Sequence, residues 1–272
     1  MRYLRTVIVI LFIVAAVAFG YSEYRIKVNE DSTLPVITGS NEMLQLNCDY
    51  NESDLLTGLS AYDEKDGDLT DKIMVGSVSR FYSTGKFKVT YVVFDSGNNP
   101  GTFTRDAEFT DYVSPEFTLS EPLVFTEGNS SSEYESLGAV DVVDGDISNA
   151  IRFTYSSVNF KTSGDYQISV EVSNSFGDVQ KLNLPVHIVE STNIKMKINL
   201  SENLVYIKKG DKFDPKKYLV SVDPLFGEDV DKNTVKITSG VKTDAEGCYE
   251  VKYEVSGAGD SRGVAWLTVV VR

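Results

Sequence analysis

Six aspartates, in two short and similar stretches, are the residues whose types and spacing could do chemistry. They are Asp63, Asp66 and Asp68 around Gly67, and Asp141, Asp144 and Asp146 around Gly145. Three carboxylates so close together, beside a glycine that permits a tight bend, could supply hard oxygen ligands to Ca²⁺. The spacing is not that of an EF-hand loop, which needs a bidentate glutamate where this chain has Met74. Ca²⁺ is therefore the one candidate cofactor, and no other is expected.

The same aspartates also have a structural interpretation, which the sequence favours. Asp68 can cap a helical turn that leads to Ile73, with Asp71 as its capping-box partner. Asp146 precedes a similar turn, and Ile151 follows it at the same offset. The shared offset predicts that the motif directs an isoleucine into the core. The Asp-Gly pairs are then turn residues.

Nothing else in the sequence marks a catalytic centre. His187 is the only histidine, and its strand also contains Pro185, so we expect a surface or edge residue rather than a ligand. No nucleophile is marked for it, as a hydrolase triad would require. Cys48 and Cys248 are too far apart in the repeat pattern for a disulfide to be expected. We therefore expect that the chain is not an enzyme.

A strand pattern that occurs three times must position these residues. In each copy a glycine stands two residues before an aromatic, and strict alternation of apolar and polar residues follows. The copies occupy residues 84–93, 163–172 and 246–255. A period of two indicates a strand with one buried face. The copies recur at intervals of about 80 residues, which predicts three small all-β domains.

The predicted domains are residues 34–112, 113–190 and 191–272. They follow residues 1–33, which are expected to be a membrane anchor or signal segment with a short charged stalk over residues 22–33. The connections between them are short and have no Gly/Ser tract, which favours semi-rigid joints. Each domain is expected to close a core of its own. Trp266, in the last predicted strand, is expected in the core of the third.

The glycine-led step resembles the tyrosine corner of immunoglobulin domains, in which the aromatic precedes a disulfide cysteine by two residues. Here Val89, Ile168 and Val251 occupy the cysteine position, so aliphatic packing would replace the disulfide.

Residues 61–70, with the sequence Ala-Tyr-Asp-Glu-Lys-Asp-Gly-Asp-Leu-Thr, and the Asp-Ser-Gly-Asn turn at residues 95–98 carry a more specific resemblance. They resemble tandem bacterial immunoglobulin-like domains of cell-surface proteins, a kind also found appended to crystal toxins. Residues 139–147 match in part, whereas residues 226–231 lack the central glycine. The resemblance implies an all-β fold of three tandem immunoglobulin-like β-sandwiches after an N-terminal hydrophobic helix. It also implies spacer and adhesion roles without enzymatic activity.

The N-terminal segment predicts export. Arg2 and Arg5 precede an unbroken apolar run from Val7 to Phe19, which places the N-terminus in the cytoplasm and the later residues outside. Residues 6–21 would span about 24 Å as a helix, less than the ~30 Å hydrocarbon core. The small residues at 16–18 fit a signal-peptidase site, but no polar region precedes them. We expect an uncleaved single-pass anchor in the cell membrane, with secretion after cleavage as the alternative.

The charge of the chain restricts its partners. A formal net charge of −14 and a pI near 4.6 argue against nucleic acid and anionic lipid surfaces as partners. The expected function is that of a spacer and a protein–protein adhesion surface toward a cell-surface or extracellular protein. The alternative is a carbohydrate- or cell-wall-binding accessory protein, with a wall glycan as its ligand.

Overall fold

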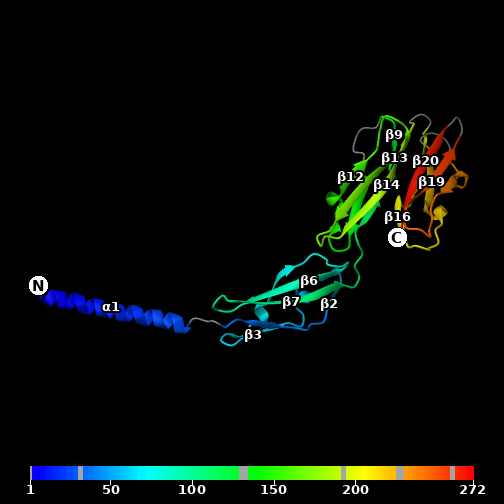
Figure 1. Cartoon of the computed structure of the whole chain (residues 1–272). Coiled ribbons are helices and arrows are strands. Elements are labelled where there is room, and N and C mark those ends of the chain that lie inside the picture. Colours follow the sequence, from blue (N-terminus) through cyan, green and yellow to red (C-terminus); the bar gives the residue numbers. More distant parts are fainter. Residues whose placement is uncertain (1, 30–32, 129–133, 191–193, 225–229, 258–260) are drawn as a thin grey trace. The chain divides into compact units, whose positions relative to one another are not determined.

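A computed structural model describes residues 2–29, 33–128, 134–190, 194–224, 230–257 and 261–272 (Figure 1). Helix α1 (Arg2–Asn29) begins the chain, and most of the later elements are strands. The chain divides into two compact units, Met1–Thr110 and Asp111–Arg272.

Helix α1 is longer than the apolar run from which it was predicted. Within it, the stretch Tyr3–Arg25 has 23 residues, contains an 18-residue window with a mean hydropathy of 2.3, and has exposed side chains. At 1.5 Å per residue it is about 35 Å long, which exceeds the ~30 Å hydrocarbon core. The helix is thus long and apolar enough to cross a membrane. A signal sequence at the N-terminus would pass the same test.

The first unit pairs a small sheet with a larger one. The small sheet has the order β1–β3–β4, and the larger one has the order β2–β7–β6–β5 with β2 parallel to β7. The strands are β1 (Val36–Thr38), β2 (Leu44–Leu46), β3 (Ser60–Asp63), β4 (Gly67–Asp68), β5 (Met74–Val78), β6 (Lys86–Phe94) and β7 (Pro100–Phe109). Strand β6 is the first copy of the alternating pattern. As predicted, Phe87, Val89, Tyr91 and Val93 are fully buried.

A buried arginine closes the first unit where the short helix α2 (Glu52–Leu55) ends. Arg105, 7% exposed, donates from Nη1 to the carbonyl of Thr57 at 3.0 Å and from Nη2 to the carbonyl of Leu55 at 2.5 Å. Its Nε donates to the hydroxyl of Tyr91 at 2.9 Å. Carbonyls at a helix C-terminus have no partner within the helix, so the fork of donors on Arg105 satisfies them.

The second unit repeats that arrangement twice. Its first pair of sheets has the orders β8–β10–β11 and β12–β13–β14–β9, and its second pair has β15–β17 and β16–β20–β19–β18. Strand β9 runs parallel to β14, and β16 runs parallel to β20, as β2 does to β7. The strands of the first pair are β8 (Glu116–Leu119), β9 (Val124–Thr126), β10 (Leu137–Asp141), β11 (Gly145–Asp146), β12 (Arg152–Ser156), β13 (Gly164–Ser173) and β14 (Val179–Val189). Those of the second are β15 (Met196–Leu200), β16 (Leu204–Ile207), β17 (Leu219–Pro224), β18 (Lys236–Ser239), β19 (Gly247–Ser256) and β20 (Arg262–Val271).

In the second unit, the structure shows why a glycine stands two residues before the aromatic ring of each repeated strand. The Tyr166 hydroxyl donates to the carbonyl of Thr162 at 2.9 Å, and the Tyr249 hydroxyl donates to the carbonyl of Ala245 at 3.0 Å. Each ring thereby lies over its own glycine. A Cβ added at Gly247, where φ is 154°, would touch the ring of Tyr249 at 3.4 Å. That distance is an ordinary van der Waals contact, so the need for glycine comes from the φ value, which residues with a side chain rarely adopt.

The second and third predicted domains each have a buried cluster, but the two clusters are not fully separate. Leu204 and Val270, from β16 and β20, belong to the same buried cluster as Val186 and Ile188 of β14. In Figure 1 the sheet that contains β13 and β14 lies beside the sheet that contains β19 and β20. The reason is that β20 is apolar on both faces, so one face closes its own core while the other covers a neighbour.

Candidate functional site

The last aspartate of each acidic stretch accepts a hydrogen bond from the first residue of a tight helical turn. It stands one residue before the N-cap position expected for it, because Leu69 and Ile147 are the N-cap residues and make no side-chain cap bond. Oδ1 of Asp68 accepts the backbone N–H of Thr70 at 2.9 Å, just before the 3₁₀ turn η1 (Thr70–Lys72). Oδ1 of Asp146 accepts the N–H of Ser148 at 2.9 Å, before η2 (Ser148–Ala150). Hydrogen bonds from the Thr70 and Ser148 hydroxyls are the main causes that lower the pKa values of these two carboxyls. Both aspartates are therefore ionised acceptors at the start of their turns.

The predicted purpose of the turn is confirmed at its far end. Ile73 follows η1 and is 7% exposed, so it lies in the core of the first unit. Ile151 follows η2 and packs against the core cluster of the second unit while remaining half-buried. The third turn is present although its sequence is degenerate. Oδ1 of Asp231 accepts the N–H of Asn233 at 2.9 Å, and the buried Val235 follows. The adjoining residues 226–229 of that predicted copy lie outside the described residues.

The middle aspartate of each stretch ties its turn to a loop that is distant in the sequence. Oδ2 of Asp66 accepts the N–H of Ser96 at 2.7 Å, and Oδ2 of Asp144 accepts the N–H of Ser175 at 2.6 Å. The backbone N–H of Ser96 is also the largest cause that lowers the pKa of Asp66. Each of these carboxylates therefore joins the loop after the central strand to the acidic turn.

The first aspartate of each stretch is buried at the base of its turn. Asp63 is 1% exposed, and its Oδ1 accepts the N–H groups of Lys65 at 2.8 Å and Asp66 at 3.0 Å. Asp141 is 6% exposed and accepts two N–H groups in the same way, from Val143 and Asp144. The Asp66 N–H is the largest cause that lowers the pKa of Asp63, and it outweighs the opposing effect of burial.

The six aspartates thus mainly accept hydrogen bonds from backbone N–H groups. Among the described residues, no three His, Cys, Asp or Glu side chains gather as a metal-binding cluster would require. Ca²⁺ binding by these aspartates stays a prediction. Sequence reasoning did not identify the two loop serines, because hydrogen bonds to a carboxylate across 30 residues leave no periodic signal.

A second cluster joins the two pairs of sheets within the second unit. His187 of β14 is 6% exposed, and its Nδ1 lies 2.7 Å from Oδ1 of Asp165 on β13. Its Nε2 lies 2.7 Å from Oε1 of Glu250 on β19. The imidazole stacks on Trp266 of β20, with ring centroids 4.0 Å apart. Burial alone would lower the pKa of His187, but the hydrogen bonds and charges of Glu250 and Asp165 outweigh it, so the pKa is raised.

The predictions for His187 and Trp266 are both wrong. His187 is not a surface or edge residue, because the third predicted domain covers the outer face of β14. Trp266 lies on the face of β20 opposite its core and is only half-buried. The sequence did contain one indication of this packing, because β20 is apolar on both faces.

Cys248 faces the same join, as its alternation away from the core implied. It is half-buried and packs against the core cluster that contains Val186. Burial raises the pKa of its thiol to about 12, so the thiol is neutral at ordinary pH.

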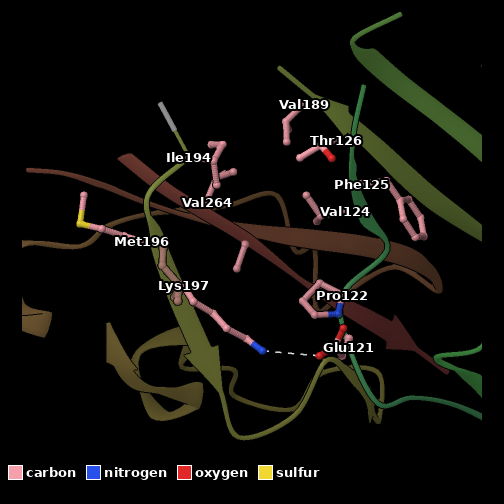
Figure 2. A pocket seen from close by; sticks show the side chains of 12 residues that line it. Glu121, Pro122, Val124, Phe125, Thr126, Val189, Ile194, Met196, Lys197 and Val264 are labelled. Carbon is pink, nitrogen blue, oxygen red and sulfur yellow. Dashed lines mark hydrogen bonds and ion pairs between the residues drawn. The ribbon is translucent and has the colours of Figure 1, made fainter. Parts of the chain in front are cut away.

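A pocket of about 260 Å³ opens beside this join (Figure 2). Figure 2 shows Val124 and Phe125 of β9 on one side and Met196 and Lys197 of β15 on the other. Lys197 reaches Glu121 across the pocket, with 3.5 Å between Nζ and Oε1. The lining is mostly apolar, so the pocket offers few groups that could orient a polar ligand.

Exposed aromatic rings are the other surface feature of the two units. Tyr62 and Tyr82 in the first unit are 61% and 54% exposed, and Tyr155 in the second is 56% exposed. Tyr155 and the neighbouring Phe153 lie on β12, the edge strand of its sheet. Flat aromatic faces of this kind can stack on a sugar ring or on a partner protein.

Comparison with known proteins gives one curated relative and several remote structural neighbours. No protein-family model matches the chain. The chain is 29% identical over 234 residues to the pesticidal crystal protein Cry22Aa of Bacillus thuringiensis. The match covers 82% of this chain but only 31% of that protein, so the chain spans less than a third of its relative.

The structural neighbours are similar only at a low level. The CBM51-2 and INT domains of Clostridium perfringens ZmpB, solved in complex with GlcNAc, are 18% identical with a TM-score of 0.24. That match covers 60% of this chain and 30% of the other. The protocadherin GammaB4 extracellular domain is 13% identical with a TM-score of 0.21, over 88% of this chain and 50% of the other.

Proposed function

We propose that this chain is a non-catalytic, membrane-anchored protein whose β units lie outside the cell and act as a spacer and a protein–protein interaction surface. The observation that carries the proposal is the combination of an exposed helix of membrane length with β units built from one repeated strand motif. The net charge of −14 favours a basic protein surface as the partner.

The β units are proposed to be three tandem immunoglobulin-like sandwiches. Three pairs of sheets with corresponding strand orders support this count, although the last two pairs form one compact unit. The bonds from Tyr166 and Tyr249 to carbonyls four residues upstream are those of a tyrosine corner. Both observations favour a scaffold that binds its partner through surface loops rather than through a central cleft.

The single histidine supports a role without catalysis. A general base needs one ring nitrogen available to the proton that it removes. Both ring nitrogens of His187 are engaged, by Asp165 and Glu250. The ring is also covered by Trp266. The cluster thus serves to hold two sheets together.

The anchor is tested by the intact mass of the full chain recovered from membranes. We expect the mass of the uncleaved chain in the membrane fraction. An Ala16→Leu, Ala18→Leu variant, which removes the small residues of the cleavage pattern, is the matched control and should give the same fractionation. A wild-type chain shortened to a start near residue 19 and found in the medium, with the variant retained in membranes, would contradict the anchor.

The exposed tyrosines favour one second candidate, a carbohydrate- or wall-binding accessory role. Pull-down of the full chain in detergent with purified peptidoglycan and with neutral polysaccharides tests it. Loss of retention on Tyr155→Ala would support stacking of this ring on a ligand ring. Tyr155→Phe keeps the aromatic face and should bind normally. Retention that is the same with and without the tyrosine ring would reject stacking by Tyr155.

A further inference from the structure

The two acidic turns make equivalent hydrogen bonds. The loops that follow strands β6 and β13, at residues 95–99 and 174–178, also make equivalent hydrogen bonds to each other. Asp95 begins this loop in the first unit, and its Oδ1 accepts the N–H of Asn99 at 2.7 Å. Asn174 begins it in the second unit, and its Oδ1 accepts the N–H of Asp178 at 2.9 Å. The next residue of each loop, Ser96 or Ser175, donates its N–H to the middle aspartate of its turn. Asp95 and Asn174 therefore occupy equivalent positions.

The chemical difference between these two residues falls on the buried aspartate. In the second unit Nδ2 of Asn174 donates to Oδ2 of Asp141 at 3.1 Å. The first unit has a carboxylate at that position, and an ionised carboxylate only accepts hydrogen bonds. Oδ2 of Asp63 accordingly has no hydrogen-bond partner among the described residues, although Asp63 is 1% exposed. Asp95 itself is 7% exposed.

The equivalence of the two loops places the unpaired Oδ2 of Asp63 toward the carboxylate of Asp95, whose Oδ2 accepts the side-chain amide of Asn99 at 2.8 Å. The charge of Lys65 is the smallest of the influences that lower the pKa of Asp63, so it compensates this pair of carboxylates little. Oxygen atoms of this kind are the ligands that Ca²⁺ prefers, and the ion takes further oxygens from backbone carbonyls and water. Two protein carboxylates are few, which corresponds to the weak binding, with Kd about 10⁻⁴–10⁻³ M, of extracellular calcium modules.

We propose that the first unit binds a divalent cation of the Ca²⁺ class between the carboxylates of Asp63 and Asp95, and that the amide of Asn174 takes the place of this cation in the second unit. The proposal is independent of the anchor and of the interaction surface. It also changes the ligand set expected from the sequence, because Asp66 and Asp68 act on backbone N–H groups.

The exchange of one carboxylate for one amide gives a matched pair of variants. Asp95→Asn places in the first unit the amide found in the second, so it should fold and should need no cation. Asn174→Asp makes the reverse change and should give the second unit a cation dependence that the wild type lacks. Asp63→Asn removes the buried carboxylate itself and provides a second test if one variant folds poorly.

The measurement is calorimetric titration of the full chain in detergent with CaCl₂, together with hydrogen exchange of peptides that cover residues 60–70 and 93–100. We expect one site with a Kd of about 10⁻⁴–10⁻³ M. We also expect slower exchange in both peptides with Ca²⁺, and loss of both effects in Asp95→Asn.

Three results would overturn the proposed cation site. The proposal is overturned if 10 mM Ca²⁺, a concentration about ten times the expected Kd, changes neither peptide. It is also overturned if Asp95→Asn responds to Ca²⁺ as the wild type does, since the ion would then bind elsewhere on this acidic chain. Slower exchange of both peptides on mild acidification alone, with no effect of Ca²⁺, would show a shared proton instead and would equally reject the cation.

Discussion

The imidazole of His187 lies flat on the indole of Trp266, with ring centroids 4.0 Å apart and planes inclined by 10°. His187 belongs to β14 and Trp266 to β20, so the stack joins the two four-stranded sheets of the second unit. Lys252 places its Nζ 5.4 Å from the centroid of the same indole. Because Trp266 is the only tryptophan, its fluorescence reports directly on this join.

The join should strengthen as the pH falls toward the range in which His187 is protonated. Glu250 and Asp165 raise the pKa of His187 above its ordinary value of 6.5 despite the opposing effect of burial. The folded unit therefore binds this proton more tightly than the unfolded chain does. The stabilisation is fully present below pH 6.5 and is lost as the pH rises through the higher pKa of the folded state. Thermal unfolding followed by Trp266 fluorescence from pH 6 to pH 9 measures it.

The control for this prediction removes the titrating group. His187→Gln should give an unfolding midpoint that changes less with pH over the same range, and should cost about 2 kcal/mol near pH 6 because Glu250 loses a charged partner. Asp165 contributes little to this cost because its side chain is 87% exposed and screened by water. A wild-type midpoint that rises with pH would show that the proton is not held in the folded state.

The glycine-led step should be sensitive to a single methyl group. Tyr249→Phe loses the bond to the carbonyl of Ala245 and should cost about 1 kcal/mol. Gly247→Ala should cost at least as much, because a φ of 154° is a backbone conformation that residues with a side chain rarely adopt. Denaturant unfolding of the second unit measures both. Tyr155→Phe, at an exposed ring, should leave the midpoint unchanged. If all three substitutions changed the unfolding midpoint equally, the Gly247–Tyr249 pair would have no special structural role.

Arg105 should tolerate no conservative replacement. Its guanidinium reaches two carbonyls and the hydroxyl of Tyr91 from a site that is 7% exposed. A lysine has a single ammonium and cannot reproduce this fork, so Arg105→Lys should cost about 2–3 kcal/mol in the first unit. Lys88→Arg, at an exposed pair with Asp106, is the control and should be nearly neutral. Calorimetric unfolding of the full chain measures both, and a neutral Arg105→Lys would mean that one donor suffices.

The hydrogen bond from the Thr70 N–H to Asp68 should depend on an acceptor atom at residue 68 rather than on the charge of its side chain. Asp68→Asn keeps an oxygen for the N–H of Thr70 and should preserve the turn, whereas Asp68→Ala should open it. Hydrogen exchange of the Thr70 amide distinguishes the two. Exchange that speeds up equally in both variants would show that the carboxylate charge, not the acceptor, holds the turn.

Local patterns predicted the parts of the fold that depend on neighbouring residues. The strict alternation of β6 requires one buried face, so its four inward residues could be read from the sequence. The bond from Thr70 to Asp68 and the burial of Ile73 follow from spacing over a few residues, although the N-cap residue itself is Leu69. The helix at the N-terminus was predicted too, although its ends were not, because charged residues extended α1 beyond the apolar run.

The parts that were missed depend on contacts between distant residues. His187 was expected at a surface, and only the packing of β19 and β20 on β14 brings Glu250 and Trp266 to it. The contrast between Asp95 and Asn174 was also missed, since it acquires meaning only when each residue is seen against its buried aspartate. The alternating pattern shows which face is buried but not which strand covers the opposite face.

Protease treatment of intact cells that carry the full chain with an N-terminal epitope tests the proposed role most directly. We predict that external protease removes the β units while the epitope stays in the membrane fraction on a fragment that contains α1. The reason is that the proposed topology places the N-terminus inside the cell and the residues from Thr33 onward outside it. A chain that is fully protected until the cells are opened, or an epitope that is absent from the membrane before protease is added, would contradict the account.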